Sequence, residues 1–218
     1  EQLRRARPEA RFLELVHRLD KETSGLLVIA KKRSALTALQ DVFRHRQAHK
    51  TYAALVSGAW PGNKKVIDVA LHKFLTAEGE RRVKAVRGDD DEGRRSISLV
   101  HVVQRFAAFT LLDVTIKTGR THQIRVHLSN EGHGIVGDDK YGDFALNKAL
   151  ARPSGDGGPA GVDRRRLPEG RFERMFLHAR YLRIPHPVSG TELTFEAPLP
   201  SECLGLLAAL QPAATRLE

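Results

Sequence analysis

The sequence predicts an α+β fold in which a largely antiparallel, mixed β-sheet is flanked by helices and loops. Strand-like apolar runs follow one another along most of the chain, separated by clusters of Gly, Pro or acidic residues, whereas few stretches show helical spacing. The 218 residues, 41% of them hydrophobic, are also sufficient for one domain with a real core.

The N-terminal part is expected to begin with an arm and then enter the sheet. Residues 1–12 are basic and sparse in apolar groups, which is typical of an arm or the remnant of a linker. The apolar run at 26–30 is predicted to be a buried strand that holds the preceding polar residues in place. Apolar residues at helical spacing then predict an amphipathic helix over 34–43.

Seven further strands are expected, and turn clusters separate the central ones. The acidic residues of the turn at 88–93 are predicted to be solvated, because consecutive carboxylates in a turn cannot all converge on one metal ion. The strands are expected at 52–56, 66–70, 82–86, 96–103, 109–116, 175–184 and 193–197.

Two more helices and a long loop are predicted. Gly132 is expected to close a helix over 120–131, and Ser201 to cap a last helix that ends near residue 211. Residues 153–168 contain several Gly and Pro and three successive arginines, which predicts a long surface loop.

Composition favours a polyanionic partner. The chain has 36 Lys and Arg against 26 Asp and Glu, a net charge of +10, and a pI near 10.1. Spread arginines suit a folded RNA backbone, whereas a membrane surface would need a basic amphipathic helix. No apolar run approaches the length of a membrane span, and the single cysteine, Cys203, excludes an intramolecular disulfide and is expected to pack in the last helix. We therefore expect an RNA partner, no membrane and a cytoplasmic location.

The most informative stretch is HRLDKETSG, residues 17–25, which places one arginine and one carboxylate just before an apolar run. Arg18 and Asp20 are two residues apart and would share a face in extended backbone, and residues 23–25 supply turn chemistry. Taken alone, such a pattern is more often a surface turn with a local ion pair than a site.

The longer stretch HRLDKETSGLLVIAK, residues 17–31, closely resembles the active-site motif of the RluA class of RNA pseudouridine synthases. Three later segments fit the same family in the expected order: KTYAAL at 50–55, GRTHQIRVH at 119–127 and LHA at 177–179. The resemblance extends from about residue 12 to residue 200. It implies the pseudouridine synthase fold with a central RNA-binding cleft, and isomerisation of uridine to pseudouridine with no metal and no nucleotide cofactor.

The resemblance implies catalytic roles for three residues. Asp20 would act as a nucleophile on the sugar or the pyrimidine ring, or assist deprotonation of the sugar, and Arg125 would pair with it and keep it ionised. Tyr52 would stack on the flipped base and is the candidate base for removing the ring proton after recombination. Without the resemblance, Tyr52 would be read as a packing residue of a strand and Arg125 as a helix-surface arginine.

Four more residues are predicted to contact the substrate or its RNA. Arg18 would fill the space left by the extruded uridine, its flat guanidinium replacing the lost stacking. Leu177 would form an apolar floor beneath the pyrimidine. Arg120 and His122 belong to the same motif as Arg125, and His122 would share one face of the predicted helix with Arg125.

The histidines are not expected to bind a metal. His122 and His127 are five residues apart, unlike the four-residue spacing of zinc-binding pairs on a helix. His17 is expected to be a structural hydrogen-bonding residue rather than an acid or base.

Residues 1–16 most resemble the members of this family that act on the 23S ribosomal RNA of the bacterial large subunit. That RNA is the expected partner, bound by a monomer without a cofactor. These members usually carry an S4-type RNA-binding domain and a lysine-proline motif strand before this point, and neither is found, so residues 1–218 are predicted to be a trimmed catalytic domain with weaker RNA affinity. The stretch 151–171 is longer than expected for the family.

Two other classes of protein remain open. A non-catalytic RNA-binding module would explain the charge but has no need of an Asp and Arg pair inside a long specific motif. A hydrolytic nucleosidase or glycosidase would commonly need a second carboxylate, and none is evident as a partner of Asp20. Pseudouridine formation that is lost in Asp20→Asn would exclude the first class, and an unchanged RNA mass would exclude the second.

Overall fold

The computed structural model describes residues 2–86, 91–152 and 158–213, and a seven-stranded sheet is its main feature. The strands of this sheet are β2 (Ser24–Gly25), β4 (His49–Ser57), β5 (Val66–Asp68), β8 (Ile97–Arg105), β9 (Phe109–Ile116), β10 (Leu177–Pro185) and β11 (Glu192–Glu196). Six of them follow the order β11-β10-β4-β9-β8-β5, and the short β2 pairs with β10 beside this path.

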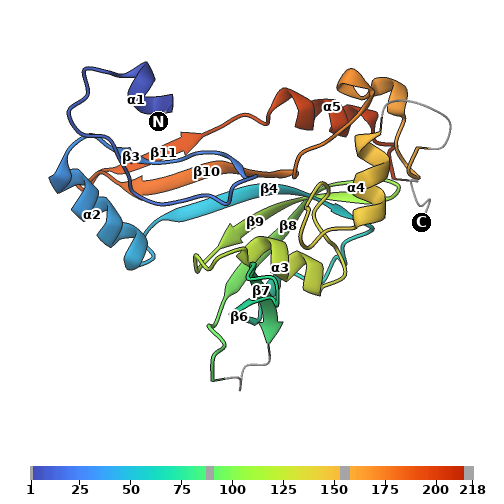
Figure 1. The fold of residues 1–218 in the computed structure, drawn as a ribbon, viewed down its shortest axis with the longest axis horizontal. Coiled ribbons are helices and arrows are strands. Elements are labelled where there is room, and N and C mark those ends of the chain that lie inside the picture. The colour runs from blue at the N-terminus through green and yellow to red at the C-terminus, as the bar shows by residue number, and fades with distance from the viewer. Residues whose placement is uncertain (1, 87–90, 153–157, 214–218) are drawn as a thin grey trace.

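Two smaller sheets accompany the main one. β1 (Glu14–Leu15) pairs with β3 (Ile29–Ala30), and β6 (Ala70–Leu75) pairs with β7 (Arg81–Val86). In Figure 1 the strands β10, β4 and β11 run along the longest axis of the molecule, and the β6–β7 hairpin projects away from it.

Helices lie at both ends of the molecule and on one side of the sheet. They are α1 (Gln2–Ala6), α2 (Arg33–Arg44), α3 (Gln123–Asn130), α4 (Phe144–Ala151) and α5 (Ser201–Ala209), with 3-10 turns at Arg164–Arg166 and Pro168–Gly170. Figure 1 shows α1 and α2 at one end, α4 and α5 at the other, and α3 below the sheet. None of the helices in the described ranges is long and apolar enough to cross a membrane.

The prediction of an α+β fold with a largely antiparallel sheet is confirmed. Within the described residues the strand pairs are antiparallel except for β2 with β10. The strand predicted at 109–116 coincides with β9, which lies between β4 and β8 and is mostly buried. The amphipathic helix predicted over 34–43 is α2, which buries Leu39 and Val42.

The buried strand predicted at 26–30 is largely wrong. Only Ile29–Ala30 forms a strand, and Leu27 is 41% exposed. The backbone of Gly25, at φ 109, lies so close to Ala179 that a Cβ there would meet the Ala179 carbonyl, and the Leu26 N–H donates to that carbonyl at 2.9 Å. The chain therefore pairs with β10 only over the short parallel strand β2 and does not continue as a strand through residues 26–28.

Other elements differ from the prediction at their ends or were missed. Strand β6 and helix α4 were not predicted. Helix α3 begins at Gln123 rather than at residue 120, and the N-cap of α5 is Pro200 rather than Ser201. Within the predicted arm 1–12 the structure contains α1, which buries no residue. Parts of the predicted turn at 88–93 and of the predicted loop at 153–168 lie outside the described residues.

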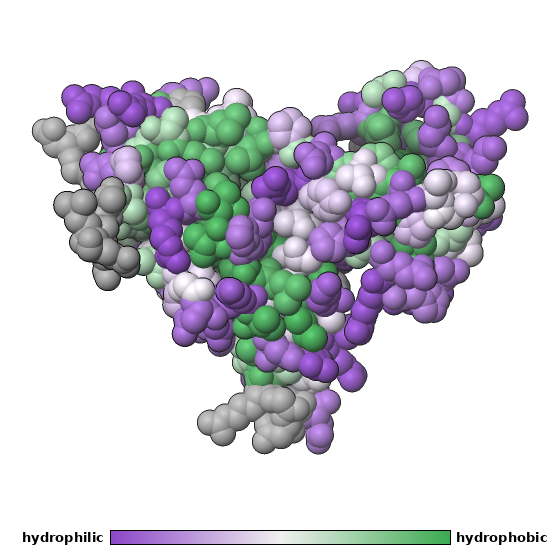
Figure 2. All heavy atoms as spheres, turned by 180° about the vertical axis from the view of Figure 1, so that it is seen from behind, coloured by the Kyte–Doolittle hydropathy of each residue, from purple (hydrophilic) through white to green (hydrophobic). Residues whose placement is uncertain are grey.

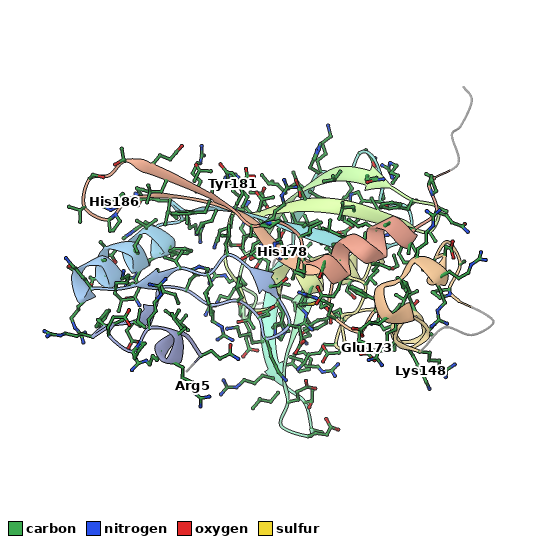
Figure 3. All side chains as sticks on the ribbon, turned by 90° about the horizontal axis from the view of Figure 1, so that it is seen from above. Arg5, Lys148, Glu173, His178, Tyr181 and His186 are labelled. Carbon is green, nitrogen blue, oxygen red and sulfur yellow. The ribbon has the colours of Figure 1, made fainter. Side chains whose placement is uncertain are left out.

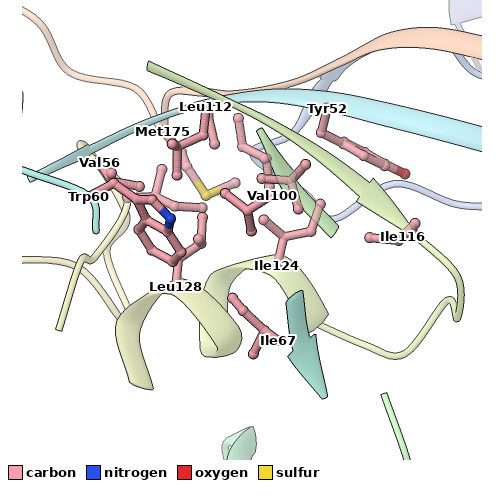
Figure 4. Packing of buried hydrophobic residues seen from close by; sticks show 14 of the residues in the cluster. Tyr52, Val56, Trp60, Ile67, Val100, Leu112, Ile116, Ile124, Leu128 and Met175 are labelled. Atoms are coloured by element: carbon pink, nitrogen blue, oxygen red, sulfur yellow. The ribbon is translucent and has the colours of Figure 1, made fainter. Parts of the chain in front are cut away.

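The hydrophobic core is divided into several clusters of buried residues. The first core cluster lies between the sheet and α3, where Trp60, Leu128 and Met175 pack against the strands (Figure 4). Its buried members are Tyr52, Ala54, Val56, Trp60, Ile67, Val100, Leu112, Val114, Ile116, Ile124, Leu128, Ile135, Met175, Leu177 and Ala179.

The second core cluster joins the sheet to α4, α5 and the 3-10 turns. Its buried members are Leu55, Phe106, Phe109, Leu111, Val136, Leu150, Leu167, Phe172, Phe176, Cys203, Leu206, Ala209 and Leu210. The packing role predicted for Cys203 in the last helix is confirmed, and burial raises the pKa of its thiol to about 11. A third cluster packs α2 against Leu182 and Ile184 of β10.

The β10–β11 ribbon extends away from the middle of the sheet. Figure 3 shows His178 near the middle of the molecule, Tyr181 farther along β10 and His186 at the turn into β11. The surface is mixed: on the face shown in Figure 2, hydrophilic side chains dominate the edges and apolar side chains form a band between them.

Candidate active site

A cleft of about 400 Å³ opens where the HRLD segment, strand β4 and the start of α3 meet. Six of the seven predicted site residues line it, so the structure brings together segments that are far apart in the sequence. The six are Arg18, Asp20, Tyr52, Arg120, Arg125 and Leu177.

The carboxylate of Asp20 faces the guanidinium of Arg125 across this cleft. Asp20 Oδ2 lies 4.0 Å from Arg125 Nη1, which is the long end of an ion pair. The side chain of Asp20 is 19% exposed and that of Arg125 is 4% exposed. Asp20 is therefore neither remote from Arg125 nor closed off from a ligand.

Two other carboxylates hold Arg125 more closely than Asp20 does. Asp138 accepts hydrogen bonds from Nε and Nη2 at 2.7 Å each, and Asp139 accepts one from Nη2 at 3.1 Å. Burial alone would lower the pKa of Arg125, but the hydrogen bond and charge of Asp138 outweigh it and the pKa is raised. Arg125 is consequently a fixed cation.

The prediction that His122 shares a helix face with Arg125 is wrong, because His122 precedes the first residue of α3. It is the N-cap residue, with a left-handed backbone at φ 53, a conformation that few residues other than Gly adopt. Its Nδ1 lies 2.8 Å from the Tyr141 hydroxyl. Burial is the main cause that lowers the pKa of His122, which favours the neutral ring. His122 is not among the residues that line the cleft.

Strand β4 presents Lys50 and Tyr52 to the cleft, because residues two apart on a strand share a face. Tyr52 is 8% exposed, and burial followed by the charge of Asp20 raises its pKa, so the hydroxyl is protonated at neutral pH. Burial lowers the pKa of Lys50, whose ammonium lies 5.3 Å from the centre of the Phe43 ring.

Leu177 begins β10 opposite Ala54 of β4 and is 3% exposed. It belongs to the first core cluster together with Tyr52, and it also lines the cleft. The cleft therefore has an apolar wall that continues directly into the core.

The cleft is strongly electropositive. Seven cationic side chains line it, and Asp20 is the one carboxylate among the lining residues that the structure describes. The seven are Arg18, Arg44, Arg46, Lys50, Lys117, Arg120 and Arg125. A polyanion is the ligand such a surface favours.

Gln123 explains why the loop before α3 has a fixed shape. Its side-chain oxygen accepts from the Thr118 hydroxyl at 2.7 Å and from the Arg120 N–H at 3.1 Å. Its amide nitrogen donates to the Ile97 carbonyl at 2.9 Å and to the Ser98 hydroxyl at 3.0 Å. A buried amide with all these bonds satisfied ties the loop to strand β8.

His17 is a structural residue, as predicted. Its Nε2 accepts a hydrogen bond from the Val28 N–H at 3.1 Å, and its ring stacks on Phe43 at 4.5 Å. Burial, followed by the charge of Lys50, lowers the pKa of His17 to about 4, which keeps the ring neutral. The side chain supports the wall of the cleft.

Sequence reasoning missed Asp138 and Tyr141. A signal was present, because two glycines flank them in GDDKYG, residues 137–142. Gly137 has φ 78 and its backbone lies against the Arg174 carbonyl, so no side chain fits there. Such a fixed turn places the charges within it accurately.

This geometry can support nucleophilic chemistry by one carboxylate. Asp20 has a fixed cation beside it, an apolar wall for a flat ring, and several cations for phosphates. Asp138 is buried against Arg125 and does not line the cleft, so the two-carboxylate arrangement of a glycosidase is not formed by the lining residues described.

Comparison with known proteins points to one family. Residues 1–130 match the family model described as RNA pseudouridylate synthase. Ribosomal large subunit pseudouridine synthase C of Yersinia pestis is 43% identical over 215 residues, which are 99% of this chain and 61% of that protein. The Escherichia coli K12 protein of the same name is 43% identical over 199 residues, 91% of this chain and 56% of that protein. The chain thus spans about three fifths of the length of these relatives.

Solved structures have the same fold. Human RNA Pseudouridylate Synthase Domain Containing 1 superposes with a TM-score of 0.72 at 27% identity, covering 99% of this chain and 80% of that chain. Human RNA Pseudouridylate Synthase Domain Containing 4 gives a TM-score of 0.70 at 26% identity, covering 95% and 79%.

Proposed function

The chain belongs to the RNA pseudouridylate synthase family, and from this premise we propose that it isomerises uridines to pseudouridine in the 23S ribosomal RNA of the large subunit. The observation that carries the proposal is the approach of Asp20 to Arg125, 4.0 Å apart in a cleft that also contains Tyr52 and Leu177. The chain would be an isomerase of the RluC subgroup, which is the subgroup of the ribosomal large subunit pseudouridine synthases C, and would act without a cofactor.

The reaction rearranges bonds within one nucleotide. The bond from N1 of uracil to C1′ of ribose breaks, the base turns, and a bond forms from C5 to C1′. C5 loses its hydrogen as a proton and N1 gains one, so no redox partner and no phosphate transfer is required. Asp20 is the nucleophile, attacking either C1′ of the sugar or C6 of the ring, and Arg125 keeps its carboxylate ionised.

The other residues hold the uridine outside the RNA stack. Tyr52 stacks on the base and Leu177 supports it from the apolar wall. Because the pKa of Tyr52 is raised, its hydroxyl donates a hydrogen bond at neutral pH and becomes a strong base only once deprotonated. Arg18 fills the vacated position in the RNA, and Arg120 and His122 contact the flanking strand.

The substrate assignment is supported by the relatives and by charge. The relatives from Yersinia pestis and Escherichia coli are named for the ribosomal large subunit, and the cleft has seven cations beside one carboxylate. The proposal includes action as a monomer in the cytoplasm, and light scattering of the purified chain with and without RNA tests the monomer.

The test is to incubate the chain with protein-free 23S RNA, and separately with small-subunit RNA, and to map carbodiimide adducts specific for pseudouridine. The proposal expects new adducts at defined uridines of the 23S RNA, with unchanged RNA mass. Adducts on neither RNA, despite binding, would identify a binding module instead. Release of free uracil would identify a hydrolase.

A further inference from the structure

Arg125 is shared unequally by three carboxylates. Asp138 takes the Nε and Nη2 edge of the guanidinium at 2.7 Å for each bond, and Asp139 adds a bond to Nη2 at 3.1 Å. Asp20 is approached by Nη1 alone, at 4.0 Å. The edge of the guanidinium best suited to a bidentate pair is therefore already occupied by a residue outside the cleft lining.

Asp138 is itself anchored. It is fully buried, and its Oδ1 accepts from the backbone N–H groups of Lys140 at 2.9 Å and Tyr141 at 3.0 Å. Asn147 of α4 donates to the Asp138 carbonyl at 2.8 Å and accepts from the Gly137 N–H at 2.7 Å. Asp138 is thus fixed from its own turn and from a separate helix.

The guanidinium is also confined on its face, because its central carbon lies 5.1 Å from the centre of the Tyr141 ring. With one edge and one face occupied, Arg125 cannot turn toward the cleft while Asp138 remains in place.

We propose that Asp138 is a positioning residue that holds Arg125 by its Nε and Nη2 edge, so that only Nη1 faces Asp20 and the Asp20 carboxylate stays free to attack. This inference rests on the proposed function. A buried guanidinium without Asp138 would turn to the next carboxylate, and a bidentate pair with Asp20 would occupy both oxygens of the nucleophile.

Asp139 offers a matched control. It contacts the same Nη2 of Arg125, and Asp139→Asn makes the same change of charge as Asp138→Asn. Its side chain, however, is 66% exposed and does not line the cleft. A general electrostatic effect on Arg125 would appear in both variants, whereas a positioning effect would appear only in Asp138→Asn.

The experiment measures single-turnover release of tritium from 23S RNA labelled at C5 of uridine, because that hydrogen is lost when the carbon bond forms. Asp138→Asn is expected to slow release about 10²-fold, the cost typical of a misplaced catalytic group, with the Kd for the same RNA changed by less than about twofold. Asp139→Asn is expected to stay within about threefold of the unchanged chain.

A double-mutant cycle separates positioning from a loosened fold. Arg125→Lys keeps a charge but loses the planar fork, so adding Asp138→Asn to it should slow release by less than about threefold more. Independent slowing by both changes would overturn the proposal. Equal rates for Asp138→Asn and the unchanged chain would overturn it too.

Folding and the proposed function are checked in the same experiment. Thermal unfolding is recorded for each variant, and if Asp138→Asn does not fold, Asn147→Ala replaces it, since it loosens the turn without leaving a buried charge unpaired. Asn147→Ala must then slow release at unchanged Kd, and a normal rate would overturn the proposal. If the unchanged chain releases no tritium, the proposed function fails instead.

Discussion

Helices α3 and α5 both bury residues in the core, but only α3 also buries strongly polar and charged side chains. Three of the six buried residues of α3 are polar or charged, namely Gln123, Arg125 and His127. The buried residues of α5 are Cys203, Leu206 and Ala209, none of them charged. The buried polar residues of α3 therefore fix the positions of groups near the cleft, whereas the buried residues of α5 provide apolar packing.

The comparison also explains how buried polar groups are tolerated near the site. Both ring nitrogens of His127 are within hydrogen-bond distance of partners, Ser98 at 2.9 Å and Val69 at 3.1 Å. Arg125 is paired with Asp138, and Gln123 has its amide satisfied. A polar interior of this kind stabilises little but defines positions sharply, so damage to it should affect turnover before folding, except where a charge is left alone.

The largest effect on stability is expected where a substitution leaves a buried charge without its partner. Arg125→Met leaves the Asp138 carboxylate buried without its cation, which should lower the free energy of unfolding by about 3–5 kcal/mol. Urea unfolding at neutral pH measures the loss. A change of less than about 1 kcal/mol would mean that Asp138 is not held by this pair.

The second-largest loss of stability is expected from a cavity in the core beside α5. Leu206→Ala removes a fully buried side chain from the second core cluster and should cost about 3 kcal/mol. Below the unfolding transition, its single-turnover rate on RNA should match that of the unchanged chain. A slowed rate in the folded variant would contradict the proposal that α5 contributes packing and not the positioning of the site.

A substitution of Lys50 tests the role of the positive charge in the cleft while the proposed nucleophile, Asp20, is left unchanged. Lys50→Met should weaken binding of 23S RNA about tenfold. It should also reduce the slope of log Kd against log salt concentration by the amount expected for about one phosphate contact. Filter binding at several salt concentrations measures both. Lys148→Met on α4 removes an exposed lysine outside the cleft, near the edge of the molecule in Figure 3, and is the matched control. Equal losses in the two variants would show that only net charge matters.

The smallest expected effect is the pH dependence of stability at His17. Its pKa is about 4 in the folded protein and 6.5 in the reference state, so between these values the unfolded chain binds the extra proton and stability falls as the pH falls. Between pH 6.5 and pH 5.5 the unchanged chain should lose about 1 kcal/mol more than His17→Gln. Urea unfolding at both pH values checks this, and parallel losses would remove His17 from the account.

The fold was predictable where local pattern and tertiary packing agree. Strand β9 was predicted at its observed ends because its apolar run is long and lies in the middle of the sheet. Helix α4 was missed because its sequence, FALNKALA, shows little helical patterning, and its start depends on the Asp143 side chain accepting from the Leu146 N–H. Strand β6 was missed because its residues alternate weakly and it forms by pairing with β7.

The site residues that lie within recognisable sequence motifs could be predicted, and the others could not. Arg18 and Asp20 come from such a motif, and the resemblance supplied Tyr52, Arg120, Arg125 and Leu177. Asp138 could not be found in this way, because it reaches Arg125 only after the chain turns at the end of α3 and folds back. The left-handed backbone of His122 likewise results from the turn into α3 and not from its own preference.

The most direct measurement of the central claim compares the unchanged chain with Asp20→Asn for pseudouridine formed in protein-free 23S RNA under single-turnover conditions. Asp20 is the cleft's nucleophile in this account, so Asp20→Asn should lose about 10³-fold or more in rate while its RNA Kd and its urea midpoint stay nearly unchanged. Pseudouridine formed by Asp20→Asn at the rate of the unchanged chain would contradict the account.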